Sequence, residues 1–268
     1  MRSTLSLIRR EFTAYFFSPV AYVVLGVFLL GMGLLFHFTL QLLSAGGPQG
    51  VEFPMQGLLG NVGFWLIFWI IPPLLTMRLF AEERSTGTLE MLMTAPVRDT
   101  QVVLSKFLAC FLFYVLLWLP TLAYLWILLD VHTGDAGSRW LFGITFGVDP
   151  WPAATSYIGL LLAGAMFLAI GMWVSSLVRS QMVAAMLSLA INLVFILGGL
   201  LILGGFIAPP SDTGEWSYRL VNFISVPLHF SHDFCRGLID TRHLVLYVSV
   251  TIACLFLTVK SLESRRWR

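Results

Sequence analysis

The side chains best suited to binding a metal ion lie just before the last long apolar run of the sequence. His229, His232, Asp233 and Cys235 are of the types that coordinate transition metals, and the two histidines are three residues apart, so one helical face could carry both. Histidines in a loop are nevertheless more often packed or solvated, and no other loop adds an obvious ligand. We therefore predict no metal site.

The serine, histidine and lysine residues do not form a recognisable catalytic or nucleotide site. A protease site within a membrane needs a serine and a histidine, or two aspartates, at one depth. Ser175 and Ser176 end one apolar run, whereas His243 begins another run on the opposite side. The sequence lacks a GxxxxGK(S/T) loop for nucleotide phosphates, and no glycine directly precedes Lys106 or Lys260. We expect a protein that is not an enzyme and binds no cofactor of its own.

A charged segment between two apolar runs is the remaining candidate for function. Positions 79–100 read LFAEERSTGTLEMLMTAPVRDT. Gly87 can end one helix and begin another, Glu90 can complete a partial capping box, and Pro96 disfavours helix at the residue before it. The apolar residues that would share one face of this short helix are Leu89, Leu92 and Met93. The pattern predicts an amphipathic helix of about two turns.

The charges around this short helix balance one another. Positions 78–106 hold four acidic and four basic residues, so the segment is not a basic patch that anionic lipids would attract. Apolar anchors within a rim of mixed charge are typical of protein–protein interfaces. One interpretation is a docking surface for a partner, and the other is a solvated turn that only joins two spans.

Long apolar runs must position these residues. The chain is 58% hydrophobic and only 11% charged, whereas soluble domains are about 25% charged. Six runs can cross a bilayer as helices, at about 20–43, 58–80, 102–129, 153–178, 183–207 and 243–260. The sequence predicts an all-α integral membrane protein with six transmembrane helices, kinked or broken at Pro72, Pro73 and Pro120.

The distribution of basic residues predicts the orientation. The N-terminus, positions 78–106, the turn at Arg179 and the C-terminus hold 12 of the 16 lysines and arginines, but only 6 of the 14 acidic residues. Lysine and arginine gather on the cytoplasmic side of membrane proteins. Both termini and the charged segment are therefore expected in the cytoplasm.

The segments flanking the spans also carry patterns. Residues 1–18 predict an amphipathic helix at the membrane interface that ends at Pro19, the alternative being an ordinary basic flank of the first span. The residues on its apolar arc are Leu5, Ile8, Phe12, Tyr15 and Phe16. The outer loop 208–242 is too apolar for a free loop, so we expect short helices there.

The spans contain almost no ionisable side chains. Lys106 lies near one end of the third span, where its amine is expected to reach the interface. Asn61 and Asn192 are the main buried polar candidates, and neither titrates. Because transporters coupled to ions or protons use buried carboxylates or discontinuous helices, we expect the energy source to lie outside this chain.

The charged segment resembles a known family. "FAEERSTGTLEMLMTAPV" followed by "VVLSKFLA" resembles the cytoplasmic loop of ABC-2 type permease subunits of ATP-binding-cassette transporters. The ends "RREFTAYFFSPVAY" and "RGLIDTRHLVLYVSV…LESRRW" resemble its gliding-motility-associated (GldF-like) branch. The resemblance implies an interfacial helix at 1–18, a six-helix permease domain at 19–268, a coupling helix at about 82–96, and re-entrant helices in the outer loop.

The resemblance also implies the functional residues and the partners. Two copies of a separate ATPase, which bind ATP and magnesium, would dock on the coupling helix. Its residues are Glu82, Glu83, Arg84, Gly87, Thr88, Leu89, Glu90, Leu92 and Pro96. A second permease chain, identical or related, would complete a dimer, and the translocation path would lie at the dimer interface. Its candidate residues are Asn61, Phe64, Phe68, Asn192 and Phe195.

The implied function is export across the bacterial cytoplasmic (inner) membrane. A periplasmic auxiliary subunit is a further expected partner, and nucleic acid is not. Two other functions stay open. One is a self-sufficient secondary transporter or channel, and the other is a membrane scaffold or mechanotransmission subunit of a gliding or secretion machine.

Overall fold

The regular structure is helical throughout the part of the chain that is described. The computed structural model describes residues 2–17, 19–46, 54–85, 87, 99–124, 150–205 and 216–266. The helices are α1 (Arg2–Phe17), α2 (Pro19–Gly46), α3 (Pro54–Leu59), α4 (Val62–Thr76), α5 (Ala81–Ser85), α7 (Asp99–Trp118), α9 (Pro150–Leu177), α10 (Gln181–Leu203), α11 (Trp216–Ile224), α12 (Val226–His232) and α13 (Thr241–Arg266), with a 3-10 helix η1 (Phe234–Arg236).

Six helical segments within these residues are long and apolar enough to cross a membrane. They are Pro19–Gln41, Val62–Ser85, Asp99–Tyr124, Trp151–Leu177, Gln181–Leu203 and Thr241–Ser264. Each has at least 23 residues, and about 20 are needed to span the hydrocarbon core. The prediction of an all-helical protein with six candidate spans is confirmed.

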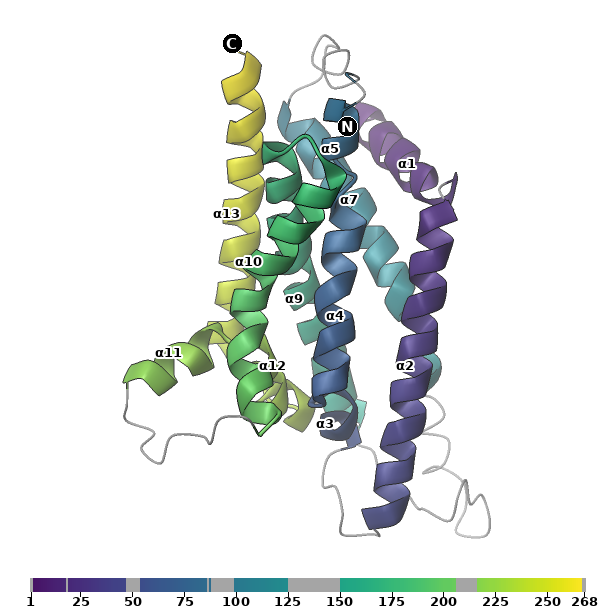
Figure 1. The fold of residues 1–268 in the computed structure, drawn as a ribbon, viewed down its shortest axis with the longest axis vertical. Coiled ribbons are helices and arrows are strands. Elements are labelled where there is room, and N and C mark those ends of the chain that lie inside the picture. The colour runs from purple at the N-terminus through teal and green to yellow at the C-terminus, as the bar shows by residue number, and fades with distance from the viewer. Residues whose placement is uncertain are drawn as a thin grey trace.

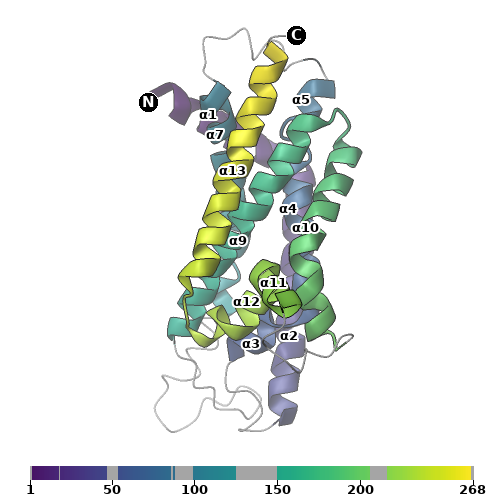
Figure 2. The same cartoon turned by 90° about the vertical axis from the view of Figure 1, so that its left-hand side faces the viewer.

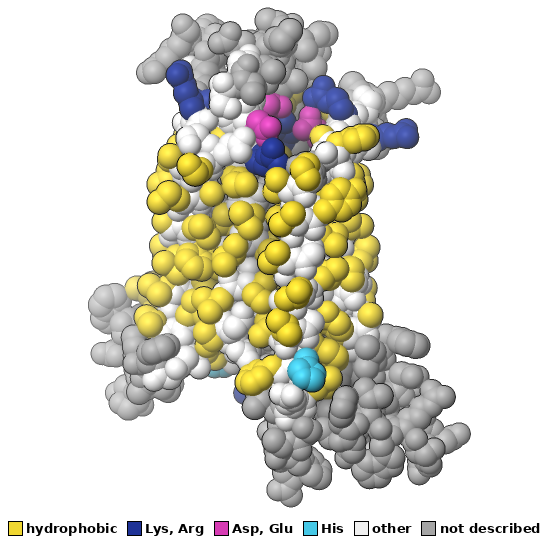
Figure 3. Space-filling view, turned by 45° about the vertical axis from the view of Figure 1, so that its right-hand side comes forward, with side chains coloured by type: hydrophobic (Ala, Val, Ile, Leu, Met, Phe, Trp, Pro, Cys, Tyr) yellow, Lys and Arg dark blue, Asp and Glu magenta, His cyan; other side chains and the backbone are white. Residues whose placement is uncertain are grey.

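Helix α9 lies at the centre of the bundle, and α2, α10 and α13 lie at its edge (Figures 1 and 2). In its most apolar stretch 72% of α9 is buried, against 17% for α13. Helix α9 contacts α4, α7, α10 and α13. The outer helices present apolar side chains over a broad belt (Figure 3), as expected of surfaces that face lipid.

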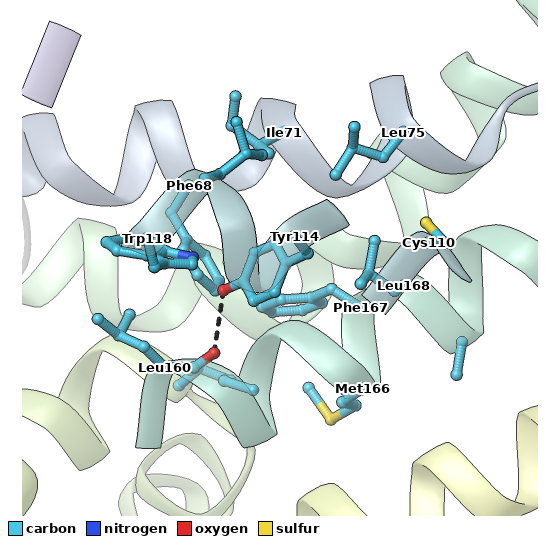
Figure 4. Close-up of a cluster of buried hydrophobic side chains, with 14 of the residues drawn as sticks. Phe68, Ile71, Leu75, Cys110, Tyr114, Trp118, Leu160, Met166, Phe167 and Leu168 are labelled. Carbon is cyan, nitrogen blue, oxygen red and sulfur yellow. Dashed lines mark hydrogen bonds between the residues drawn. The ribbon is translucent and has the colours of Figure 1, made fainter. Parts of the chain in front are cut away.

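Aromatic side chains fill the contact between α7 and α9. The Tyr114 hydroxyl donates to the Leu160 carbonyl at 3.0 Å (Figure 4). The ring lies so close to Gly164 that a Cβ atom there would overlap it. Small residues in spans allow such close approach, so α7 and α9 pack through a large side chain set against a glycine.

The prolines and polar residues of the second and third spans mark breaks. Helix α4 contains Pro72 and Pro73 and ends at Thr76, and α7 ends at Trp118, with Pro120 in the turn that follows. The structure also breaks the second span before α4, where the Asn61 side chain accepts a hydrogen bond from the Gly63 amide at 2.9 Å and begins the helix. Asn61 therefore caps a helix instead of lying within one.

The two ends of the bundle differ in what they carry. Helices α1 and α5 and the C-terminal end of α13 lie at one end, and α3, α11 and α12 lie at the other (Figures 1 and 2). Helices α11 and α12 and η1 fall inside the predicted outer loop 208–242. Helix α5, which falls within the predicted charged segment, therefore lies at the same end as both ends of the described chain.

Candidate functional site

A cluster of charged side chains lies at the end of the bundle where α1, α5 and the first turns of α7 meet. Figure 3 shows acidic and basic side chains gathered there, directly beyond the apolar belt. We call the five residues Glu11, Arg78, Glu82, Glu83 and Lys106 the charged cluster. They come from three separate stretches of sequence, and all five line one cavity.

Lys106 of α7 lies at the centre of the charged cluster. Its amine is 2.7 Å from Glu83 Oε1 and 3.0 Å from Glu11 Oε2, and its side chain is only 3% exposed. A buried charge must be paired to avoid a large desolvation cost. The prediction that the Lys106 amine reaches the membrane interface stays a prediction, and the structure adds that two carboxylates from α1 and α5 neutralise this amine.

Glu11 stays ionised in this arrangement. Burial opposes the charge of its carboxylate, but the Lys106 amine and the Arg10 guanidinium outweigh burial and hold the pKa of Glu11 below its ordinary value. Arg10 Nη2 lies 2.8 Å from Glu11 Oε1. The link between α1 and α7 is therefore an ion pair at neutral pH.

Helix α5 is bound at both ends to the end of α9. The Ser175 hydroxyl accepts hydrogen bonds from the Phe80 and Ala81 amides at 3.2 and 3.1 Å, so it caps the start of α5. Arg84 Nη1 donates to the carbonyls of Ser176 and Val178 at 2.8 and 3.0 Å. These carbonyls belong to the C-terminal end of α9, where a positive charge is favoured.

A second ion pair lies nearer the surface. Arg78 Nε is 3.0 Å from Glu82 Oε2, one helical turn away, and the two side chains are 34% and 43% exposed. Exposed pairs of this kind contribute about 0–1 kcal/mol. The pair therefore adds little to stability and leaves both charges accessible from outside.

A cavity of about 380 Å³ opens beside these charges. Beyond the charged cluster its wall is apolar and comes from α2, α4 and the turn after α4. The apolar lining residues used below are Val20, Ala21, Val24, Leu74, Leu75 and Leu79. The Tyr15 hydroxyl, also in the wall, donates to the Leu75 carbonyl at 3.2 Å. The cavity thus has one charged end and one apolar end.

The predicted coupling residues are described only in part. Glu82, Glu83 and Arg84 lie together on α5, and Gly87 has a left-handed backbone with φ of 74°. The other predicted residues lie outside the described residues: Thr88, Leu89, Glu90, Leu92 and Pro96. Of the predicted helix at about 82–96, the structure therefore describes only the first turn, which begins at Ala81.

Comparison with known protein families agrees with this architecture. A family model described as "ABC-2 family transporter protein" matches residues 51–227, which is well over half of the chain. The chain belongs to this ABC-2 family. A search of curated proteins finds no match. The protein is therefore a multi-pass membrane permease component of an ABC-2 transporter, a class that typically lacks ATPase activity itself and works with an ATPase partner.

The predicted path residues of this ABC-2 permease lie in different surroundings. Phe64 and Phe68 are fully buried in the core, where Phe68 contacts Phe167 at a ring distance of 5.6 Å. Phe195 of α10 contacts the other side of Phe167 at 6.2 Å. Asn192 is fully buried, and its side-chain oxygen and nitrogen have no hydrogen-bond partner among the described residues. Asn61, as described above, caps α4.

The histidines at the opposite end of the permease are packed and hydrogen-bonded. His229 stacks on His243 with ring centroids 3.6 Å apart, and its nitrogens lie 2.8 Å from the Tyr247 hydroxyl and 2.8 Å from the Asn222 carbonyl. His243 Nε2 lies 2.9 Å from Asp233 Oδ2. Among the described residues, no three His, Cys, Asp or Glu side chains are grouped to hold a metal ion.

Burial and the neighbouring imidazole of His243 lower the pKa of His229 to about 3. A carbonyl can only accept, so Nε2 of His229 carries the proton and donates to Asn222, and Nδ1 accepts from Tyr247. This neutral histidine therefore joins α11 to α13 through α12.

Three residues at the end of the bundle that carries the charged cluster were not predicted from the sequence as part of a site. Glu11, Lys106 and Ser175 come from separate helices and are brought together only by packing. Lys106 did carry a signal, because it is one of only two lysines in the chain and stands inside an apolar run. An ionisable residue in a span predicts a buried partner, although the sequence does not say which carboxylate that partner is.

Proposed function

We propose that this permease is the membrane subunit of an ABC exporter and that its charged end receives movement from a separate ATPase. In this proposal α5 and the residues that follow it dock on the ATPase at the cytoplasmic side. The observation that carries it is the bonding of α5, which contacts α9 through Ser175 and Arg84 and α7 through Glu83. A displacement of α5 would therefore act on two spans at once.

The proposal extends to the assembly. A second permease chain, identical or related, would complete a dimer, and two ATPase copies would bind ATP and magnesium below it, so that this chain needs no cofactor of its own. The membrane would be the bacterial inner membrane, with a periplasmic auxiliary subunit as a further partner. Residues Thr88 to Pro96 would continue the docking surface that begins at Glu82.

The translocation path is proposed at the dimer interface. Asn192 is the residue we assign to it first, because a fully buried amide without a hydrogen-bond partner among the described residues is costly in the resting protomer. Phe195 lies one turn further along α10. Asn61 would lie at the outer mouth of the path, and Phe64 and Phe68 would reach it only if the aromatic core rearranges.

The test measures ATP hydrolysis by the partner in a reconstituted complex with and without variants of this chain. Glu82→Ala and Glu90→Lys are expected to abolish the stimulation of ATPase activity while membrane insertion stays intact. Glu263→Ala on α13 is a matched control, because Glu263 also forms an exposed ion pair, with Lys260 at 2.7 Å. Stimulation that is unchanged in both coupling variants would show that this segment does not receive the movement.

A second measurement separates transport from a mechanical role. If a partner without ATPase activity still supports the cellular role of the complex, the chain acts as a membrane scaffold and the exporter assignment fails. If the purified chain transports without any ATPase, it is a secondary transporter or channel.

A further inference from the structure

The cavity beside the charged cluster has the composition of a site for an amphiphilic molecule. Its volume of about 380 Å³ falls within the range of about 300–1,000 Å³ that is usual for small-molecule sites. One end is lined by charged side chains and the other by aliphatic side chains of α2 and α4. Neither a wholly polar nor a wholly apolar ligand matches both ends.

The cavity lies at the level where lipid headgroups meet acyl chains. The charged cluster stands directly beyond the apolar belt of the spans (Figure 3), which is where the interfacial region begins. Val20 of α2, at the apolar end, is 37% exposed. A molecule in the cavity is therefore open both to the aqueous edge, at Arg78 and Glu82, and to the surface of α2.

The charges in the wall indicate which headgroup fits. The wall contains three carboxylates and two cations, and Lys106 is already held between Glu11 and Glu83. Arg78 and Glu82 remain the most exposed of the five, and they stand side by side. An anionic headgroup would face an excess of carboxylates, whereas a headgroup with one phosphate and one ammonium can pair with both residues.

The type of ammonium follows from the available partners. Carboxylates form short, charge-assisted hydrogen bonds with N–H donors, which a primary ammonium has and a quaternary one lacks. Quaternary ammonium groups are instead held by aromatic cages. Tyr15 is the one aromatic residue in the described wall, and its hydroxyl is bonded to Leu75.

We propose that this cavity binds a zwitterionic phospholipid with a primary ammonium headgroup. The phosphate pairs with Arg78, the ammonium pairs with Glu82, and the first part of an acyl chain lies against Val20, Val24 and Leu74. Because an exposed ion pair between residues four apart is weak, Arg78 and Glu82 can separate to take the two headgroup charges. The binding is a property of this chain alone and does not depend on the proposed coupling to an ATPase.

The test is native mass spectrometry of the purified full-length chain, titrated with phosphatidylethanolamine, phosphatidylcholine and phosphatidylglycerol of identical acyl chains. Phosphatidylethanolamine is expected to bind about tenfold more tightly than the other two, the factor for one charge-assisted hydrogen bond at a partly exposed site. Equal or tighter binding of phosphatidylglycerol or phosphatidylcholine would overturn the proposal.

Two kinds of variant locate the site. Glu82→Gln is expected to remove the preference for phosphatidylethanolamine, because Glu82 pairs with the ammonium. Arg78→Gln is expected to weaken binding of all three lipids, because all three carry the phosphate. Glu263→Gln, in the exposed Lys260–Glu263 pair of α13, is expected to change neither the preference nor the affinity. Ala14→Trp adds a large side chain to the cavity wall from an exposed position, so it is expected to fold and to reduce binding of all three lipids. If this variant unfolds at the temperature of the wild type and still binds phosphatidylethanolamine as tightly, the lipid is not in this cavity.

Discussion

A single lysine joins three helices of this permease. The Lys106 amine is bound by a carboxylate of α1 and a carboxylate of α5, and it is almost completely buried. Without the lysine, its two partners in the triad would carry a net negative charge, since the two carboxylates would face each other across an empty position. The triad therefore depends on the lysine more than on either acid.

We expect Lys106→Met to destabilise the protein by about 3–5 kcal/mol, because removing one partner of a buried ion pair leaves uncompensated charge. The change is measured by unfolding the purified chain in detergent, either by heating or by adding denaturant. Lys260→Met is the control, since Lys260 forms an exposed pair whose loss costs about 1 kcal/mol or less. Equal stability of Lys106→Met and wild type would contradict the role of the triad.

His229 predicts a pH dependence at the other end of the molecule. Its pKa is lowered from 6.5 to about 3 in the folded protein, so below about pH 6.5 the unfolded chain takes up a proton that the folded chain does not. Stability is then highest above pH 6.5 and falls as the pH drops toward 3, by at most about 1.4 kcal/mol per pH unit. Glu11 acts in the same direction only at the acidic end of this window, because the Lys106 amine and the Arg10 guanidinium lower its pKa against the opposing effect of burial.

The measurement is the unfolding temperature of the purified chain at several pH values from about 7.5 to about 5. His229→Gln is expected to flatten the pH dependence, although it also lowers stability at neutral pH by removing the bonds to Tyr247 and Asn222. His232→Gln, an exposed position on the same helix, should keep the wild-type slope. The groups that face His229 are Tyr247 and His243, which is paired with Asp233. If His229→Gln keeps the wild-type pH dependence, that dependence belongs to the His243–Asp233 pair and not to His229.

At the scale of elements, glycines of α9 allow other helices to pack closely against it. Glycines of α9 lie against side chains of other helices, with Gly159 against Phe230 and Phe234 and Gly171 against Thr76. Gly164 lies just as tightly against the Tyr114 ring. Its partner Tyr114 lies 50 residues earlier in the sequence, in a span whose orientation about its axis no local pattern specifies.

We expect Gly164→Ala to destabilise the permease by about 1–3 kcal/mol, because the added methyl group would overlap the Tyr114 ring in a packed interior. Gly26→Ala on α2 is the matched control, since no atom lies within 4 Å of a Cβ there. That substitution should be neutral or stabilising by up to about 1 kcal/mol through helix propensity. Thermal unfolding of both variants tests the difference, and equal effects would exclude tight packing at Gly164.

Helix α1 shows how an element can be anticipated while its partner is not. The helical spacing of apolar residues in positions 1–18 predicts an amphipathic helix, and α1 covers nearly that range. Its apolar arc contacts α7, with the Tyr15 ring stacked on Phe113 at 5.1 Å and Phe16 against the same ring at 5.9 Å. A helical pattern specifies that an apolar face must be covered, but lipid and protein cover it equally well. Its place at a membrane surface stays a prediction.

At the scale of the whole molecule, both described ends of the chain and α5 lie at one end of the bundle (Figure 1). The bias of basic residues predicts that this end faces the cytoplasm. All three native cysteines, Cys110, Cys235 and Cys254, are buried. Single cysteines placed at the surface can therefore be labelled against a low background.

We expect a membrane-impermeant maleimide to label Leu238→Cys in intact cells, because Leu238 is 59% exposed just before α13 at the end opposite α5. Thr100→Cys, exposed on the first turn of α7, should be labelled only after the membrane is permeabilised. The reverse pattern would invert the orientation and place α5 outside the cytoplasm. Labelling of both positions in intact cells would contradict a membrane-spanning bundle.

The sequence by itself determined the class of this protein, its six candidate spans and the polar segment between the second and third. Long apolar runs admit few alternatives in a bilayer, where each backbone must satisfy its own hydrogen bonds within a helix. Only the tertiary structure decided which charges meet. It places Lys106 between Glu11 and Glu83, packs Tyr114 against Gly164, and opens a two-ended cavity beside Arg78 and Glu82. These contacts depend on the rotation and relative depth of separate helices, and such features are set by side-chain packing between helices, not by the period of any one of them.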